Sequence, residues 1–165
     1  MHHYRTTMNS PIGELTILAV DDGLVAIDWS DDAGHHTDVP IGDVADVGAD
    51  DHPVLQRVVD QLGEYFAGER TEFYLPLAAR GTPFQQQAWD ALVRIPYGET
   101  VSYGEQATML GDKNKARAVG AANGKNPIPI IVPCHRVVHA SGAIGGYGRH
   151  EDRKRWLLRH ERAIE

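Results

Sequence analysis

The residues in this chain that could carry out chemistry surround its single cysteine, Cys134, which is followed directly by His135 and Arg136. A thiolate is the reactive form of cysteine, and near the ordinary pKa of about 8.5 only a few per cent of free thiols are ionised at neutral pH. A nucleophilic cysteine therefore needs a base or a positive charge close by. His135 could be that base and Glu161 could orient its ring, which would complete a thiol–imidazole–carboxylate triad.

The same cysteine also fits a purely structural role. It follows the apolar run at residues 130–132, and a lone cysteine in such a place is often an inert, buried side chain. A metal site is not expected, because one cysteine and scattered histidines lack the ligand spacing that metals require. We therefore predict neither a metal nor a cofactor.

Charge divides the chain into two unequal halves. Residues 1–80 contain 4 Lys/Arg against 15 Asp/Glu, whereas residues 81–165 contain 12 against 8, within an overall net charge of −7. Such asymmetry suggests an acidic scaffold followed by a unit that faces nucleic acid. A solvated basic surface without a ligand would give the same composition.

The sequence contains no signal for a membrane or for export. No stretch approaches the roughly 18 uninterrupted apolar residues of a membrane helix, and the N-terminal residues lack the basic-then-apolar layout of a secretion signal. One cysteine cannot form an internal disulfide, which suits a reducing compartment. We expect a cytoplasmic monomer with no membrane partner.

Strand signals open the first half. Residues 13–30 alternate around an Asp-Asp-Gly turn and predict a hairpin. Residues 30–52 are acidic and without period, so a loop is expected there. A helix should begin at Pro53 and end near Gly68, and residues 71–77 predict a short strand.

Helix signals dominate the second half. Thr82 as N-cap and Pro83 at the first position predict one helix. Ser102 and Glu105 form a capping-box pattern that predicts a second. Residues 112–126 predict a third helix, rich in small side chains, and the last two helices together resemble a helix-turn-helix.

The remaining residues predict a strand at 130–132, a glycine-rich loop at 141–148 and a final helix at 151–161. A boundary is expected within residues 78–82, which gives two domains, 1–80 and 81–165. On a regular strand, neighbouring side chains point to opposite faces. We therefore expect no direct contact between the Cys134 thiol and the His135 imidazole.

The order of several short motifs resembles one known family. "PCHRV" at 133–137, preceded by "NPIPIIV" at 126–132 and "ARAVGAA" at 116–122, is similar to the active-site region of the O6-alkylguanine-DNA alkyltransferases, also called methylated-DNA–protein-cysteine methyltransferases. The likeness covers nearly all of the second half and, more loosely, the first. It implies an α+β protein: a small N-terminal α/β domain, RNase H-like, with an antiparallel sheet and a helix, then a mostly helical, winged helix-turn-helix-like C-terminal domain.

The resemblance implies direct-reversal DNA repair. The family rotates O6-alkylguanine out of duplex DNA and transfers the alkyl group irreversibly to its own cysteine, once per molecule. Cys134 matches the acceptor, His135 the base, which would act on the thiol through a water, and Glu161 the residue that orients the base. Asn126 matches the asparagine that braces the turn beside the thiol. Activity on O4-alkylthymine is left open.

The resemblance also implies the partner, double-stranded DNA that contains O6-alkylguanine, bound through its minor groove. Arg117 matches the arginine that fills the space left by the rotated nucleotide, and small side chains on the same helix would allow close approach. The residues expected at the DNA are Tyr103, Ala116, Arg117, Gly120 and Lys125.

A guanine pocket follows from the same likeness. The backbone of Gly148 would donate to O6, and the carbonyl of Val137 would accept from the exocyclic amine. The residues expected to line the pocket are Tyr103, Pro129, Val137, Tyr147 and Gly148. Arg149 and His150 stand where bacterial members commonly have glycines, which stiffens the loop and adds charge.

Three alternatives compete with this reading. A non-catalytic sensor of alkylated DNA would lack the cysteine, which is present here. A sequence-specific transcription factor would need base-reading side chains, and the expected recognition helix has few besides Arg117. A cysteine hydrolase built on Cys134 and His135 would leave the basic half without a purpose.

Overall fold

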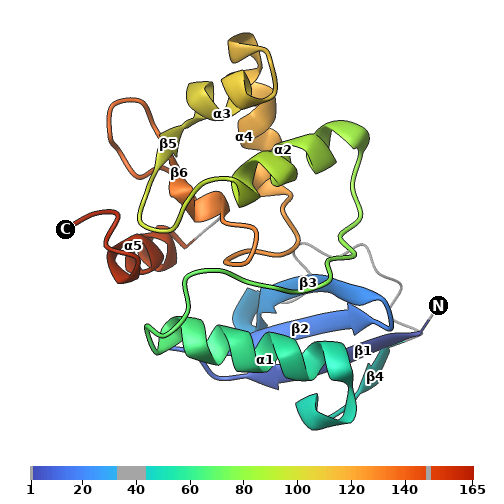
Figure 1. Cartoon of the computed structure of the whole chain (residues 1–165). Helices are drawn as coiled ribbons and strands as arrows, with labels where there is room; N and C mark the ends of the chain where they lie inside the picture. Colours follow the sequence, from blue (N-terminus) through green and yellow to red (C-terminus); the bar gives the residue numbers. More distant parts are fainter. Residues whose placement is uncertain (1, 33–43, 148–149) are drawn as a thin grey trace. The chain divides into compact units, whose positions relative to one another are not determined.

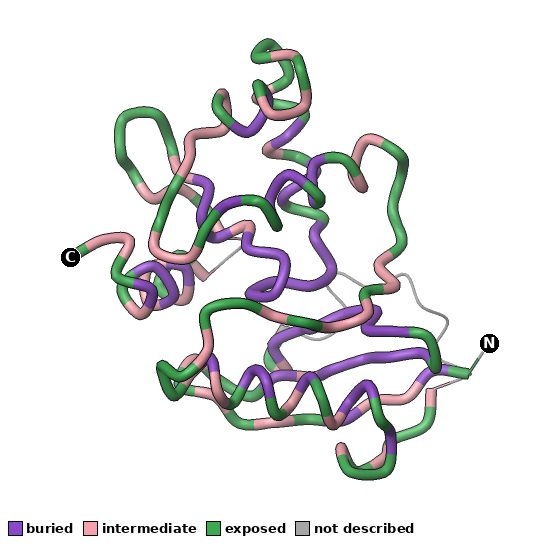
Figure 2. The backbone as a smooth tube through the Cα atoms, viewed as in Figure 1, coloured by how far each residue is buried: buried purple, intermediate pink, exposed green. Residues whose placement is uncertain are grey.

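The computed structural model describes residues 2–32, 44–147 and 150–165. The chain divides into two compact units, Met1–Arg80 and Gly81–Glu165 (Figure 1). Each unit has its own buried core, visible as purple stretches in Figure 2. Among the described residues, no helix is both long and apolar enough to cross a membrane.

The first unit is built on a four-stranded sheet. Its strands are β1 (His3–Met8), β2 (Leu15–Val20), β3 (Gly23–Trp29) and β4 (Val44–Asp46), in the order β3-β2-β1-β4. The predicted hairpin is confirmed, since β2 and β3 pair in antiparallel register on either side of the Asp21-Asp22 turn. Both strands are apolar and almost wholly buried.

Helix α1 (Pro53–Phe66) covers this sheet, as its sequence predicts. Pro53 occupies the first turn, where its missing N–H costs nothing. The apolar side chains recur at helical spacing and are buried, which explains why this segment folds onto the sheet. They are Val54, Leu55, Val58, Leu62 and Tyr65.

Two predictions for this unit are wrong. The predicted loop at 30–52 contains β4, which pairs in parallel with β1, so the sheet is mixed and not wholly antiparallel. The short pairing is reinforced by a salt bridge from Arg5 Nε to Asp46 Oδ1, 2.6 Å. Within the described part of the first unit, the predicted strand at 71–77 forms only one bridge, between Leu24 and Leu77. The Gln61 side chain bonds both the N–H and the C=O of Tyr74, so that stretch needs no strand partner.

The second unit begins with two helices whose starts were predicted correctly. Helix α2 (Pro83–Val93) has a complete capping box between Thr82 and Gln85. Helix α3 (Tyr103–Met109) has another between Ser102 and Glu105. In each, the side chains and backbone N–H groups satisfy one another reciprocally, which fixes where the helix begins.

Helix α4 (Ala116–Gly124) completes the helix-turn-helix, joined to α3 through the short 3-10 turn Lys113–Lys115. The three helices are tied together by buried amides, because Gln106 donates to Asn123 Oδ1 (3.0 Å) and Asn123 donates back to Gln106 Oε1 (2.8 Å). Trp89 Nε1 donates to the carbonyl of Ala122 at 2.9 Å. These contacts hold α4 in a fixed orientation.

The segment after α4 differs from prediction. Residues 130–132 form turns and not a strand, and Ile130 has a positive φ of 74°. The Asn126 side chain explains this, because it donates to Val132 O (2.8 Å) and accepts from Ile128 N (3.0 Å) in place of a strand ladder. The 3-10 turn Cys134–Arg136 follows.

Strand β6 (Val137–Val138) then pairs in parallel with β5 (Val101–Ser102). The chain ends with helix α5 (Glu151–His160), as predicted. These elements place the cysteine turn between the helix-turn-helix and α5.

Candidate functional site

Cys134 opens the 3-10 turn directly after Pro133. Its backbone N–H donates to Val132 O at 2.8 Å, which ties the turn to the segment braced by Asn126. Part of the residue remains accessible to solvent. Because the residue is on a 3-10 turn, the strand alternation we expected for Cys134 and His135 does not apply.

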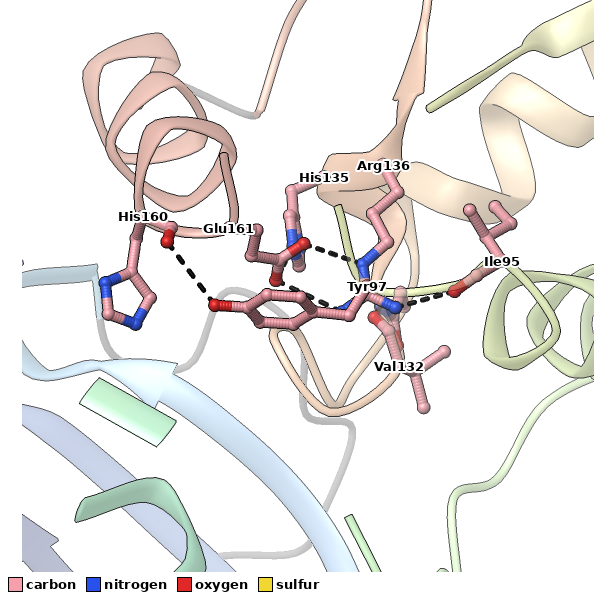
Figure 3. Close-up of polar contacts among 8 residues, drawn as sticks. Ile95, Tyr97, Val132, His135, Arg136, His160 and Glu161 are labelled. Carbon is pink, nitrogen blue, oxygen red and sulfur yellow. Dashed lines mark hydrogen bonds and ion pairs between the residues drawn. The ribbon is translucent and has the colours of Figure 1, made fainter. Parts of the chain in front are cut away.

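His135, Arg136 and Glu161 form a buried, hydrogen-bonded group (Figure 3). His135 Nε2 lies 2.7 Å from Glu161 Oε2. Arg136 donates from Nε to Glu161 Oε1 at 2.8 Å and from Nη2 to Glu161 Oε2 at 3.2 Å. Its Nη1 donates to Ile95 O at 2.6 Å, and the guanidinium lies over the Tyr97 ring. The structure thus brings together the predicted base and the predicted carboxylate.

Electrostatics fix the protonation of this group. Burial opposes ionisation of Glu161, but His135 and Arg136 outweigh it and lower the pKa of the carboxyl to about 2. Burial also lowers the pKa of His135, against the pull of Glu161, which favours the neutral ring.

The tautomer of His135 follows from its partner. An ionised carboxylate can only accept, so Nε2 carries the proton that bonds Glu161. In a neutral ring the other nitrogen, Nδ1, then holds a free lone pair. Nδ1 is buried, and no hydrogen-bond partner for it occurs among residues 2–32, 44–147 and 150–165. Nδ1 is therefore the nitrogen of His135 that can accept a proton.

The thiol of Cys134 is subject to opposing influences. Burial raises its pKa, which disfavours the thiolate. The polar side chains of Asn126 and Tyr147 and the positive charge of Lys154 act in the opposite direction and limit this rise. Because burial has the larger effect, formation of the thiolate requires a base as well as these groups.

Lys154 is a site residue that the sequence analysis missed. It is only 1% exposed, and its Nζ donates to Val137 O at 2.7 Å and to Gly146 O at 3.4 Å. Burial lowers the pKa of Lys154 to about 8, against the attraction of Cys134 and Glu151. A signal was present, because Lys154 shares a helical stripe with the apolar Leu157 and Leu158.

The predicted pocket residues partly converge on the thiol. Tyr103 is half-buried, and the pKa of its phenol is raised by burial and by the neighbouring Cys134. Tyr147 lies close enough to the thiol to lower the pKa of Cys134. Pro129 is buried in the turn before the cysteine, and Val137 is buried at the start of β6. Gly148, like Arg149, lies outside the described residues.

The predicted DNA-contacting residues lie on or next to α4. Arg117 and Lys125 are exposed, whereas Ala116 and Gly120 are half-buried. A Cβ on Gly120 would lie 3.6 Å from the Tyr103 ring, an ordinary van der Waals distance, so α4 lies directly beside Tyr103 at this position. Among the described residues, no group of three or more His, Cys, Asp or Glu side chains could hold a metal ion.

Comparison with known proteins identifies the same two units. Residues 3–79 match the family model "6-O-methylguanine DNA methyltransferase, ribonuclease-like domain", and residues 83–163 match the corresponding "DNA binding domain". These matches confirm the expected ribonuclease-like α/β fold and the helical fold that follows it.

Individual relatives align over nearly the whole chain. The methylated-DNA–protein-cysteine methyltransferase of Mycobacterium tuberculosis is 49% identical, covering 99% of this chain and 94% of the relative. The constitutive Bacillus subtilis protein of that name is 43% identical, covering 97% and 96%. The crystal structure of Mycobacterium tuberculosis OGT in complex with DNA superposes with a TM-score of 0.85 at 46% identity, covering 97% and 93%.

Proposed function

This chain belongs to the 6-O-methylguanine DNA methyltransferase family and is a methylated-DNA–protein-cysteine methyltransferase that repairs O6-methylguanine by direct reversal, and we propose that Cys134 accepts the methyl group. The observation that carries this assignment is the buried, hydrogen-bonded set of His135, Arg136 and Glu161 that follows the only cysteine in the chain and leaves His135 Nδ1 able to accept a proton. A bystander thiol would have no need of them.

The reaction that these residues support is a displacement at the methyl carbon. The Cys134 sulfur forms a bond to carbon while the bond from carbon to guanine O6 breaks, and the electron pair leaves with the base. The thiol proton passes through a water to His135 Nδ1, the buried nitrogen with the free lone pair. Glu161, held by Arg136, stabilises the resulting imidazolium.

Recognition of the base depends on the turns around the thiol. Tyr103, Pro129 and Tyr147 form the walls of the pocket, and Gly148 donates its backbone N–H to O6. The carbonyls of Cys134 and Val137 accept from the exocyclic amine. Lys154 helps to position the Val137 carbonyl for this contact, because its Nζ donates a hydrogen bond to Val137 O. Asn126 braces the turn from behind.

Binding to duplex DNA supplies the substrate. Helix α4 enters the minor groove, with Ala116 and Gly120 allowing a close approach and Lys125 at a phosphate. The target nucleotide rotates out of the stack, and Arg117 fills the space it leaves. The exposure of Arg117 and the relative solved with DNA support this proposal. We expect the protein to act as a monomer in the cytoplasm, a reducing compartment that suits a chain with a single cysteine and no internal disulfide.

A thioether is a poor leaving group, so the alkylated cysteine has no route back and each molecule reacts once. The test is to titrate the protein with excess duplex containing radiolabelled O6-methylguanine. Label should plateau at one methyl group per protein, however long the incubation. Turnover beyond one equivalent would contradict the proposal, and binding without transfer would indicate a damage sensor.

A further inference from the structure

His139 lies where the chain leaves β6 and turns back on itself. Its backbone N–H donates to Ala143 O, and Gly142 N donates to His139 O, both at 2.9 Å. This tight turn fixes the backbone of His139 and directs its ring toward Tyr103 on α3. The two ring centroids are 5.5 Å apart with planes inclined by 48°, a tilted geometry that aromatic pairs favour.

Tyr103 is enclosed from two directions. On one side, Gly120 of α4 lies beside the tyrosine ring, where a Cβ would be in van der Waals contact with Cδ1 and Cε1 at 3.6 Å. On the other, Gly145 meets both partners, since a Cβ on it would lie 2.9 Å from His139 Nε2 and 3.6 Å from Tyr103 Oη. Gly145 has a φ of 77°, which a residue with a side chain rarely adopts. The 139–145 turn is therefore shaped around the two rings.

We propose that His139 is a positioning residue for alkyl transfer, whose imidazole holds the Tyr103 ring in the orientation that serves the flipped nucleotide beside Cys134. The inference rests on the proposed function, because it assumes that Tyr103 contacts that nucleotide. His139 is not one of the residues that form the base pocket described above.

The exposure of His139 separates this role from folding. The residue is exposed, so its ring contributes little to the buried core. Tyr103, in contrast, is half-buried and lies near the thiol. Removing the imidazole should therefore leave the fold unchanged and release the tyrosine ring into additional orientations, of which only one is productive.

The experiment compares single-turnover methyl transfer at saturating duplex for four variants: His139→Ala, His139→Phe, Tyr103→Ala and the double alanine variant. We expect His139→Ala to slow transfer about fivefold, the size of effect that loss of one aromatic pair produces. His139→Phe retains a flat ring and should remain within about twofold of the wild type. His2→Ala, which removes an exposed histidine of the other unit, is the matched control.

The double variant decides whether His139 acts through Tyr103. If it does, adding His139→Ala to Tyr103→Ala should slow transfer no further. Equal slowing in both backgrounds would overturn the inference and leave the proposed function intact, as would a His139→Ala variant as fast as His2→Ala. Transfer unaffected by Tyr103→Ala would instead refute the role proposed for Tyr103 and the inference with it.

The phenylalanine variant keeps the test valid if Tyr103→Ala fails to fold. Thermal unfolding of His139→Ala and His139→Phe should match the wild type. Slow transfer in both, despite normal folding, would show that the aromatic contact is not what matters and would overturn the inference.

Discussion

Replacement of Lys154 by methionine tests whether a buried charge favours the thiolate. Methionine is unbranched and similar in length, so Lys154→Met removes the ammonium group with little change in shape. The wild-type Nζ donates to Val137 O at 2.7 Å, and the pKa of Lys154 is lowered to about 8. The charge therefore acts at the wall of the pocket and on Cys134.

The effect of Lys154→Met on stability should be small, because two contributions oppose each other. Lowering the pKa from 10.5 to about 8 means that keeping the charge buried costs about 3 kcal/mol at neutral pH. Removing it relieves that cost but loses a charge-assisted hydrogen bond of about 1.5–3 kcal/mol and strands the Val137 carbonyl. We expect the free energy of unfolding to change by less than about 2 kcal/mol.

The effect on methyl transfer should be larger. Without the charge of Lys154, the pKa of Cys134 rises further, and each pKa unit reduces the thiolate fraction about tenfold. We expect single-turnover transfer at pH 7.5 to slow about tenfold or more, with the rising limb of the pH–rate profile moved to higher pH. Lys113→Met, at an exposed lysine, should leave the profile unchanged at saturating DNA. A wild-type rate and midpoint in Lys154→Met would refute the reasoning.

Three further predictions concern the groups around the thiol. Glu161→Gln leaves Arg136 buried without its carboxylate, so the free energy of unfolding in urea should fall by about 3–5 kcal/mol, and a loss below about 1 would contradict the buried ion pair. Because the pKa of Glu161 is about 2 in the folded protein against an ordinary 4.5, the stability it contributes is complete above about pH 4.5 and is lost as the pH falls toward 2. Urea denaturation at pH 6 and pH 3 measures this: between the two pH values the free energy of unfolding should fall more in the wild type than in Glu161→Gln, which lacks the carboxylate at both. Arg117→Ala should slow transfer from duplex more than from single-stranded substrate, where no helix must be opened, and equal slowing would argue against a role in base flipping.

Local sequence signals predicted the helices well, because their starts are determined by neighbouring residues. The capping boxes at Thr82 and Ser102 satisfy backbone groups within one turn, so they could be recognised without tertiary information. The β2–β3 hairpin could likewise be predicted from its own residues, because its turn lies within the same short segment. The likeness of the motif around Cys134 then identified the family and therefore the overall fold.

The failures occurred where the conformation depends on contacts that the apolar and charged pattern of the segment does not reveal. The apolar residues 130–132 look like a strand, but Asn126 satisfies their backbone and turns replace it. Val44–Asp46 forms a strand only because β1 offers a free edge. Lys154 looks like a surface residue of α5 until the fold places its Nζ against the carbonyl of Val137. The β4 pairing and the Lys154 contact depend on tertiary structure, which no local pattern encodes.

The central claim is that Cys134 becomes methylated, and intact-protein mass spectrometry tests it most directly. The protein is mixed with a duplex containing one O6-methylguanine, beside a Cys134→Ser control, and the modified peptide is located by fragmentation. We predict a gain of one methyl group on Cys134 in the wild type and none in the control. An unchanged mass in protein that still binds the damaged duplex, or a methyl group on any other residue, would contradict this account.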